Sequence, residues 1–212
     1  MKVYLASGSP RRAQILCDAQ IVFERVSAPV EEAARAGESA VERVLRLAQS
    51  KAEAGVAAVR RVNGVRPDAQ SPRSDASALV IGADTEVVLD GEVLGKPASD
   101  DDARRMLRRL AGRTHEVITG VAVMRLPAAA GEQRIEHEVT QVTFAPLTDA
   151  DIAAYVASEE HRDKAGGYAI QGRGGTFVTR VEGCYFNVVG LPLARLARML
   201  RELGWEGKSR PV

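Results

Sequence analysis

The opening segment of the chain, MKVYLASGSPRR, holds the first residues that could do chemistry. A short apolar run stops at Ser7, and Ser9 followed by Pro10 predicts a helix start, because serine caps helices and proline is tolerated at the first helical position. The free N–H groups and the dipole of such a helix favour an anion. Arg11 and Arg12 add forked donors suited to phosphate oxygens. We expect this turn to bind phosphate, although a capped helix with two solvated arginines explains the stretch equally well.

A carboxylate and a lysine follow in the segment IGADTEVVLDGEVLGKP. Asp84 comes after apolar and small residues, so we expect it at the carboxyl end of a strand, where ligands bind in α/β folds. Lys96 follows a short hairpin. The segment is not a phosphate-binding P-loop, because three residues separate Gly91 from Gly95 and Pro97 follows the lysine.

Three further charged sites have two interpretations each. Glu31 and Glu32 are adjacent, so one of them is expected to point into a site, unless both belong to a solvated acidic loop. Lys51 lies at the edge of an apolar helix face, where lysines usually extend their amine to solvent. The run 100–102, Asp-Asp-Asp, resembles a metal cluster, but it begins a helix and compensates the helix dipole.

The segment DKAGGYAIQGRGG carries five glycines within ten residues, around Gln171. Glycine lets the backbone approach a flat ligand closely, and the glutamine amide has an acceptor and two donors with which to read a base edge. A flexible surface loop is the alternative. With three histidines and no closely spaced cysteine pair, a zinc site is disfavoured. Carboxylates with Lys and Arg indicate a hard divalent cation on a phosphate chain.

The composition of the chain disfavours several classes of function. The chain has 212 residues, 45% of them hydrophobic, and a net charge of +1, so no general field attracts nucleic acid or a membrane surface. Cys17 and Cys184 form no disulfide framework. No signal peptide is evident, and no apolar run approaches the roughly 20 residues of a membrane helix. We therefore expect a cytoplasmic globular protein that contacts neither nucleic acid nor membrane.

The sequence pattern predicts helices and strands that alternate along the chain and position these residues. Ser39 to Val62 has a clear helical period, and helices are also expected from Pro10, Ser99, Thr148 and Leu191. Strands are expected at the ranges 2–6, 21–27, 79–82, 115–126, 135–144 and 176–189, the last interrupted at Glu182-Gly183, and a hairpin that turns at Asp90-Gly91 is expected over 87–94. Residues 60–78 form an expected inserted surface loop, with 63–77 rich in Gly, Pro and Ser. The pattern predicts an α/β fold with a mixed sheet.

Several long stretches resemble the Maf family, over nearly the whole chain from Val3 to about Leu203. They are LASGSPRR, RLAQSKA, IGADTEVVLDGEVLGKP, HEVITGVAV, KAGGYAIQG and EGCYFNVVGLPL. The resemblance implies a single domain over 1–212, similar in fold to the inosine triphosphate pyrophosphatases. That fold is a mixed twisted sheet flanked by helices, with two lobes around an active-site cleft.

The resemblance also implies an activity. Maf proteins are nucleoside triphosphate pyrophosphatases that cleave between the α and β phosphates with Mg²⁺ or Mn²⁺, and the YAIQG and YFNVVGLP stretches look like those of the dTTP/UTP branch. In that branch the aspartate of GADT, here Asp84, is taken as the proton acceptor. Three positions are linked to substrate choice, here Arg11, Thr85 and Gln171. The remaining substrate-site positions of the family fall on Glu32, Lys51, Lys96 and Lys164, beside Ser7 and Arg12. We expect Asp84 and Glu32 to hold the metal.

Other interpretations stay open. Maf proteins are also associated with arrest of septum formation, so the chain could act mainly as a nucleotide-sensing regulator of cell division. A modified pyrimidine nucleotide could be the true substrate of a house-cleaning enzyme. The resemblance suggests a homodimer. Glu86 stands where the family usually has an apolar residue, and we expect it to face solvent.

Overall fold

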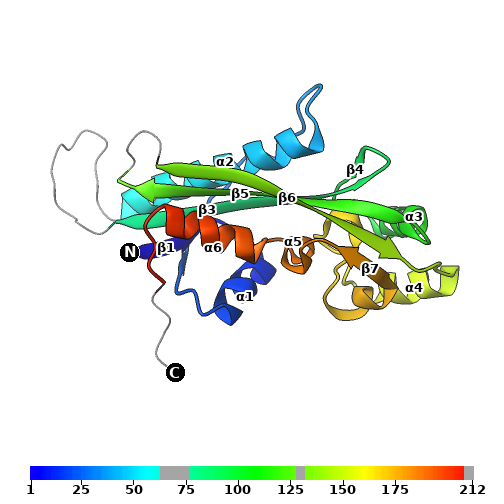
Figure 1. Cartoon of the computed structure of the whole chain (residues 1–212). Helices are drawn as coiled ribbons and strands as arrows, with labels where there is room; N and C mark the ends of the chain where they lie inside the picture. Colours follow the sequence, from blue (N-terminus) through cyan, green and yellow to red (C-terminus); the bar gives the residue numbers. More distant parts are fainter. Residues whose placement is uncertain (63–76, 128–131, 208–212) are drawn as a thin grey trace. The chain divides into compact units, whose positions relative to one another are not determined.

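The computed structural model describes residues 1–62, 77–127 and 132–207. Its strands form one seven-stranded sheet in the order β2-β1-β3-β5-β6-β7, with β4 paired to β3 (Figure 1). The strands are β1 (Lys2–Leu5), β2 (Glu24–Arg25), β3 (Ala78–Leu89), β4 (Glu92–Leu94), β5 (Thr114–Leu126), β6 (Gln133–Phe144) and β7 (Val178–Glu182). β1 is parallel to β2 and β3, whereas the β3–β4 and β6–β7 pairs are antiparallel. The predicted α/β class with a mixed sheet is confirmed.

The helices, with the exception of α5, occupy the segments whose sequence carried helical periods and caps. They are α1 (Pro10–Asp18), α2 (Ala40–Val62), α3 (Asp100–Leu110), α4 (Asp149–Ala157), α5 (Tyr185–Val189) and α6 (Leu193–Glu202), with two 3₁₀ segments, η1 (Ala165–Gly167) and η2 (Gly172–Phe177). Ser9, Ser99 and Thr148 each accept a backbone N–H at a helix start, as serine and threonine caps do. None of the helices in the described part of the chain is long and apolar enough to cross a membrane.

The chain divides into two compact units. Unit 1 comprises Met1–Asp84, Gly120–His137 and Gly190–Val212, and unit 2 comprises Thr85–Thr119 and Glu138–Val189. The boundary passes through β3, β5 and β6, so each of these strands contributes residues to both units. The two lobes and the cleft that the resemblance implies stay a prediction.

In unit 1, α2 covers one face of the sheet, and α1 and α6 lie on the other face (Figure 1). Glycines allow α2 to approach the strands closely. A Cβ atom on Gly82 of β3 would lie 2.2 Å from the Ala48 carbonyl oxygen, and one on Gly120 of β5 would lie 2.3 Å from that of Val44. Side chains of any size at these two positions would push the helix off the sheet.

In unit 2, a buried cluster of aromatic rings joins the strands to the glycine-rich segment. Phe144 of β6 packs edge-on against Tyr168, with ring centroids 4.8 Å apart, and against Phe177 at 5.9 Å. His115 of β5 lies within hydrogen-bond distance of Tyr168, with 2.7 Å between Nε2 and Oη. The Tyr155 hydroxyl of α4 accepts the N–H of Ala169 at 3.2 Å. These contacts fix the segment that leads to Gln171.

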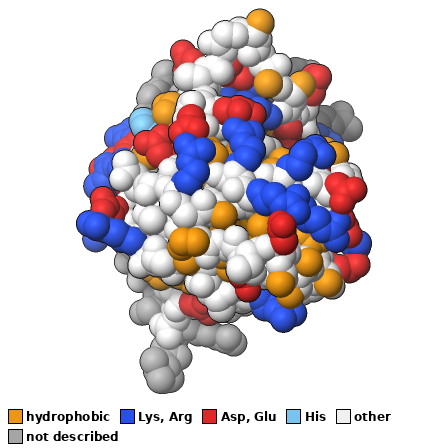
Figure 2. Space-filling view, turned by 90° about the vertical axis from the view of Figure 1, so that its right-hand side faces the viewer, with side chains coloured by type: hydrophobic (Ala, Val, Ile, Leu, Met, Phe, Trp, Pro, Cys, Tyr) orange, Lys and Arg blue, Asp and Glu red, His pale blue; other side chains and the backbone are white. Residues whose placement is uncertain are grey.

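Several surface charges of unit 2 form ion pairs. Arg113 contacts Asp90 at 2.6 Å and Arg109 contacts Glu92 at 2.6 Å. Figure 2 shows basic and acidic side chains interspersed rather than gathered by sign. This mixing agrees with the net charge of +1.

Several expectations about the elements were wrong. The strand expected at 79–82 continues through Asp84 to Leu89, because the residues beyond Asp84 are mostly strand formers and the last three pair with β4. Asp84 therefore lies within β3, beyond the point where the neighbouring β1 ends at Leu5. Glu86 is buried, with 6% of its surface exposed, and does not face solvent.

Three segment boundaries also differ from those expected. Residues 21–27 contribute only the two-residue β2. Over 176–189 the interruption expected at Glu182-Gly183 is confirmed, since β7 ends at Glu182 and Gly183 has φ +125°, but the residues after it form the helix α5 and not a strand. Of the expected inserted loop, residues 60–62 belong to α2 and 78 to β3, and 63–76 lie outside the described residues.

Candidate active site

The centre of the site in unit 1 is an ammonium group between two carboxylates. Lys51 Nζ of α2 lies 2.7 Å from Asp84 Oδ1 and 2.6 Å from Glu32 Oε1. The side chains of Lys51 and Asp84 are largely buried, with 12% and 13% exposed, whereas that of Glu32 is 45% exposed. Lys51 is therefore an ion-pairing residue, and the interpretation of a lysine that extends to solvent is wrong.

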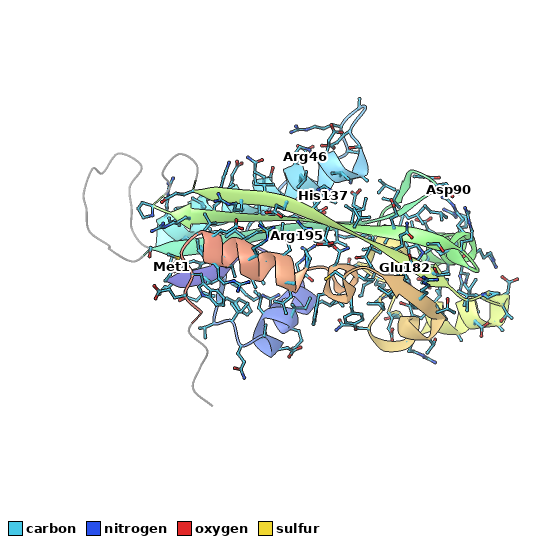
Figure 3. The ribbon with its side chains drawn as sticks, in the orientation of Figure 1. Met1, Arg46, Asp90, His137, Glu182 and Arg195 are labelled. Atoms are coloured by element: carbon cyan, nitrogen blue, oxygen red, sulfur yellow. The ribbon has the colours of Figure 1, made fainter. Side chains whose placement is uncertain are left out.

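Glu32 reaches this centre because the segment before α2 is tied to that helix. Arg43 of α2 donates to the Glu32 carbonyl oxygen at 3.0 Å. Arg46, labelled in Figure 3, donates to the Ala33 carbonyl at 3.1 Å and to Glu38 Oε2 at 2.7 Å. Of the adjacent pair Glu31 and Glu32, the structure thus brings the second one to Lys51.

Arg12 holds the backbone around the site. This side chain is buried, with 8% exposed, and its Nη1 donates to the Ala83 carbonyl at 2.8 Å and to Ser7 Oγ at 3.2 Å. Its Nε donates to the Gly190 carbonyl at 2.8 Å. Burial lowers the pKa of the Arg12 guanidinium from its ordinary value, although arginine stays charged. Arg12 therefore fixes both the opening turn and the residue before Asp84.

The opening turn is held by internal hydrogen bonds. Ser7 Oγ accepts hydrogen bonds from the Ser9 N–H at 3.2 Å and from Arg12. The Gly8 carbonyl is held by Arg25 of β2 at 3.1 Å. Because Ser7 Oγ is an acceptor in both contacts, its own hydrogen is oriented away from them and can be donated to an anionic oxygen. Arg11 is half-buried at the first turn of α1.

The other predicted substrate residues belong to unit 2. Lys96 is exposed, and Lys164 donates to the Arg162 carbonyl at 3.0 Å. Their segments meet, because the Gly166 N–H donates to the Gly95 carbonyl at 3.0 Å. Gln171 is exposed just before η2.

Thr85, also in unit 2, has a half-buried side chain with a hydroxyl partner. Its Oγ1 lies 2.9 Å from Thr119 Oγ1 of β5. Thr119 donates in turn to the Asn187 backbone carbonyl of α5 at 3.1 Å. Thr119 and Asn187 are both fully buried.

The hydrogen-bond network of Thr119 and Asn187 was not predicted, although both residues lie in stretches that resemble the family. The available signal was a polar side chain inside an apolar run: Thr119 follows Val-Ile, and Asn187 stands within YFNVV. A buried polar group is costly unless it is hydrogen-bonded. Such a residue in an apolar run therefore indicates an internal hydrogen-bond network.

The residues at Lys51 fit a hard divalent cation. Asp84 and Glu32 each place an oxygen within 2.7 Å of one nitrogen atom, so both carboxylates already converge on a single positive charge. Within the described ranges there is no group of three or more His, Cys, Asp or Glu side chains that could hold a metal. Magnesium is commonly held by one or two carboxylates together with substrate phosphates, which suits this pair.

The structure thus combines a mixed α/β fold with a hydrogen-bonded turn at a helix start and a pair of carboxylates that share one lysine. Residues 2–203 match the family described as Maf-like protein. The dTTP/UTP pyrophosphatase of Carboxydothermus hydrogenoformans is 44% identical over 97% of this chain and 100% of that protein. The dTTP/UTP pyrophosphatase of Escherichia coli strain K12 is 46% identical over 93% of this chain and 91% of its own length. The chain belongs to the Maf family.

Among solved structures, the dITP/XTP pyrophosphatase of Mycobacterium abscessus aligns with 95% of this chain and 94% of its own. The TM-score is 0.42 and the sequence identity is 14%, which is a low likeness.

Proposed function

We propose that this chain is a nucleoside triphosphate pyrophosphatase that hydrolyses dTTP and UTP to the monophosphate and pyrophosphate. The observation that carries the proposal is the convergence of Asp84, Glu32 and Lys51 in the same unit as a preformed anion-binding turn. The relatives that match nearly the full length of the chain carry that activity in their names.

In the proposed reaction, Asp84 takes a proton from the water that attacks the α-phosphorus. The new bond joins the water oxygen to this phosphorus, the bond to the α–β bridging oxygen breaks, and pyrophosphate leaves with that oxygen. No hydrogen bond to Asp84 Oδ2 is present among the described residues, so this oxygen is the one assigned to the water. Asp84 is largely buried, which limits competing solvent.

The cations and the turn would bind the phosphate chain. Ser7 and Arg11 suit the phosphate oxygens, the dipole of α1 favours an anion at its start, and Arg12 fixes the geometry of the turn. Lys96 and Lys164 would neutralise charge on the leaving pyrophosphate. Asp84 and Glu32 would hold Mg²⁺ or Mn²⁺, which supplies charge neutralisation on the phosphates and lowers the pKa of bound water.

The test is pyrophosphate release from a panel of nucleoside triphosphates with Mg²⁺ or Mn²⁺, run in ¹⁸O-labelled water. We expect dTTP and UTP to be the best substrates and the label to appear in the monophosphate. Asp84→Asn should fold and lose at least about 10²–10³ in kcat, the cost typical of one catalytic electrostatic group.

Matched controls sharpen this test. Glu32→Gln should weaken activation by the metal, whereas Glu31→Gln, next in the chain, should behave as the wild type. Label in the pyrophosphate would place attack on the β-phosphorus and refute the proposed step. Wild-type turnover by Asp84→Asn would remove Asp84 from the role of base.

We further propose a homodimer in the cytoplasm, on the basis of the family resemblance. Light scattering during size-exclusion chromatography should give twice the mass of one chain, and a mass of one chain would contradict the dimer.

A further inference from the structure

We propose that Glu38 and Arg46 are positioning residues that hold the Glu32 carboxylate at the cation site. Arg46 joins the Glu38 side chain to the Ala33 carbonyl, and we call these three groups the Arg46 clamp. The inference rests on the proposed function, in which Glu32 and Asp84 hold the divalent cation.

The segment that carries Glu32 lies outside the hydrophobic core. Residues 26–39 join β2 to α2 without a helix or strand, and every residue from Glu31 to Gly37 is exposed. Burial of apolar surface therefore contributes little to ordering this stretch, and fixing its backbone costs conformational entropy. The position of Glu32 consequently depends on polar contacts.

Arg46 of α2 makes the contacts that close this segment. Both carboxylate oxygens of Glu38 accept from its guanidinium, Oε1 from Nε and Oε2 from Nη2, the latter at 2.7 Å. The same Nη2 donates to the Ala33 carbonyl at 3.1 Å. A fork that binds a carboxylate through two hydrogen bonds is among the strong polar contacts of proteins. One guanidinium thus ties the residue that follows Glu32 to Glu38.

The ion pair of the Arg46 clamp is largely shielded from solvent. The side chain of Glu38 is 9% exposed and that of Arg46 is 17% exposed. The hydrogen bond from Arg46 lowers the pKa of Glu38 to about 2, so this carboxylate is ionised at any pH used for an assay. The Arg35 N–H also donates to Glu38 Oε2 at 3.2 Å. Removal of either charge of a shielded pair leaves the other one uncompensated, so we expect each substitution to loosen the segment.

The clamp differs in kind from the direct contact of Glu32 with Lys51. The Lys51 ammonium contacts the Glu32 carboxylate itself, at 2.6 Å. Arg46 instead contacts the backbone of the next residue, and Arg43 contacts the Glu32 carbonyl at 3.0 Å. These backbone contacts do not depend on which cation the carboxylate binds. They therefore hold Glu32 in place when its partner changes from Lys51 to a metal ion.

This arrangement predicts an effect on metal affinity more than on the chemical step. Groups that orient a metal-binding side chain typically change metal affinity or activity 10–100-fold when they are substituted. Asp84, the proposed base, belongs to the buried strand β3 and contacts no part of the clamp in the described residues. Loosening the segment should therefore weaken the cation site and leave Asp84 in place.

The first experiment measures pyrophosphate release from dTTP by the full chain as a function of Mn²⁺ concentration. Glu38→Gln removes the charge that the guanidinium binds, with little change in shape. We expect half-maximal activity to need about tenfold more Mn²⁺, with kcat at saturating Mn²⁺ within about twofold of the wild type. Arg46→Lys keeps the charge and loses the fork, so it should have the same effect; it decides the question if Glu38→Gln does not fold.

A second measurement does not depend on turnover. Mn²⁺ alone is titrated into the protein, and the electron paramagnetic resonance signal of the free ion gives the dissociation constant. We expect this constant to rise about tenfold in Glu38→Gln. Hydrogen exchange of peptides that cover 31–38 should become faster in the same variant.

A double substitution tests whether the clamp acts through Glu32. In a Glu32→Gln background, Glu38→Gln should cause no further loss of Mn²⁺ affinity, because the side chain that it positions is already changed. The matched control is Glu136→Gln, also in unit 1, whose carboxylate accepts from Arg195 at 2.6 Å and from Arg198 and is 24% exposed. Loss of this second arginine–glutamate contact should leave the Mn²⁺ dependence unchanged.

The results separate the clamp from the proposed function. A loss of Mn²⁺ affinity in Glu38→Gln that is absent from the Glu32→Gln background supports the clamp. An unchanged affinity, a further loss in that background, or an equal loss in Glu136→Gln overturns the clamp and leaves the proposed function intact. A wild-type chain that releases no pyrophosphate from dTTP or UTP refutes the proposed function, and the titration with Mn²⁺ alone then decides on the clamp.

Discussion

Arg12 and Arg11 differ in burial and in the contacts of their guanidinium groups. The first arginine of the pair is half-buried, whereas the guanidinium of Arg12 is buried against the carbonyls of Ala83 and Gly190. Three hydrogen bonds from a planar fork require its geometry as well as its charge. Arg12 is thus a framework residue of the site, and charge alone is not sufficient at this position.

We therefore expect Arg12→Lys to lower the free energy of unfolding by about 2–3 kcal/mol, because a single ammonium cannot reach the same acceptors and leaves buried carbonyls unsatisfied. Arg11→Lys should change it by less than about 0.5 kcal/mol. Urea unfolding monitored by circular dichroism measures both. Equal small effects of the two substitutions would contradict the framework role of Arg12.

At the candidate site, residue types could be predicted from the sequence, whereas the contacts between the side chains could not. Residue types and spacing predicted a phosphate turn at Ser7 and a functional aspartate at Asp84, and the family resemblance singled out Glu32. Nothing in the sequence indicated that Lys51 bridges the last two, because a lysine at the edge of a helix face usually reaches solvent. The Thr119 and Asn187 hydrogen bonds were equally unpredictable, since they join residues far apart in the chain.

At the scale of elements, α2 lies against the sheet because glycines on two strands leave room for its backbone. The Gly82 position is the tighter of them, since an added Cβ would lie 2.2 Å from the Ala48 oxygen and 2.5 Å from the Ala52 nitrogen. Both neighbours are backbone atoms, which cannot rotate away. The same helix carries Lys51, so this packing also determines the distance between Lys51 and Asp84.

Gly82→Ala should therefore destabilise the protein by about 3 kcal/mol, at the upper end of overpacking costs, and reduce turnover by displacing α2. Gly95→Ala is the matched control, because nothing lies within 4 Å of its added Cβ and its φ is not positive. Thermal unfolding with parallel assays of pyrophosphate release tests this prediction. A Gly82→Ala protein as stable as Gly95→Ala would show that α2 is free to move.

Elements with strong periodic patterns were predicted well, and elements set by distant contacts were not. The long helix over Ser39 to Val62 was confirmed to within one residue, as α2. The short helix α5 was missed, because Tyr, Phe and Val favour strands and only five residues are involved. Its conformation depends on Asn187, whose side chain bonds to β5 and β6.

At the scale of the whole molecule, buried titratable groups affect the pH dependence of folding more than ion pairs at the surface, which contribute little to stability. His115 is the clearest case, with 2% of its surface exposed and Phe144 and Tyr168 around its ring. Its Nδ1 has no hydrogen-bond partner in the described part of the chain. Burial lowers the pKa of His115 to about 4 and raises that of Tyr168, so both are neutral near pH 7.

The lowered pKa of His115 predicts how stability changes in mild acid. An unfolded histidine titrates near 6.5, so between pH 6.5 and about 4 the unfolded chain binds more protons than the folded one. Stability is complete above this window and falls as the pH is lowered through it, by about 2 kcal/mol at pH 5 and about 3 kcal/mol at pH 4. His115→Gln removes the titrating group and should lose this part of the pH dependence. Urea unfolding of both proteins at pH 7.5 and 5.0 measures the difference, and parallel losses in the two proteins would show that other groups control acid stability.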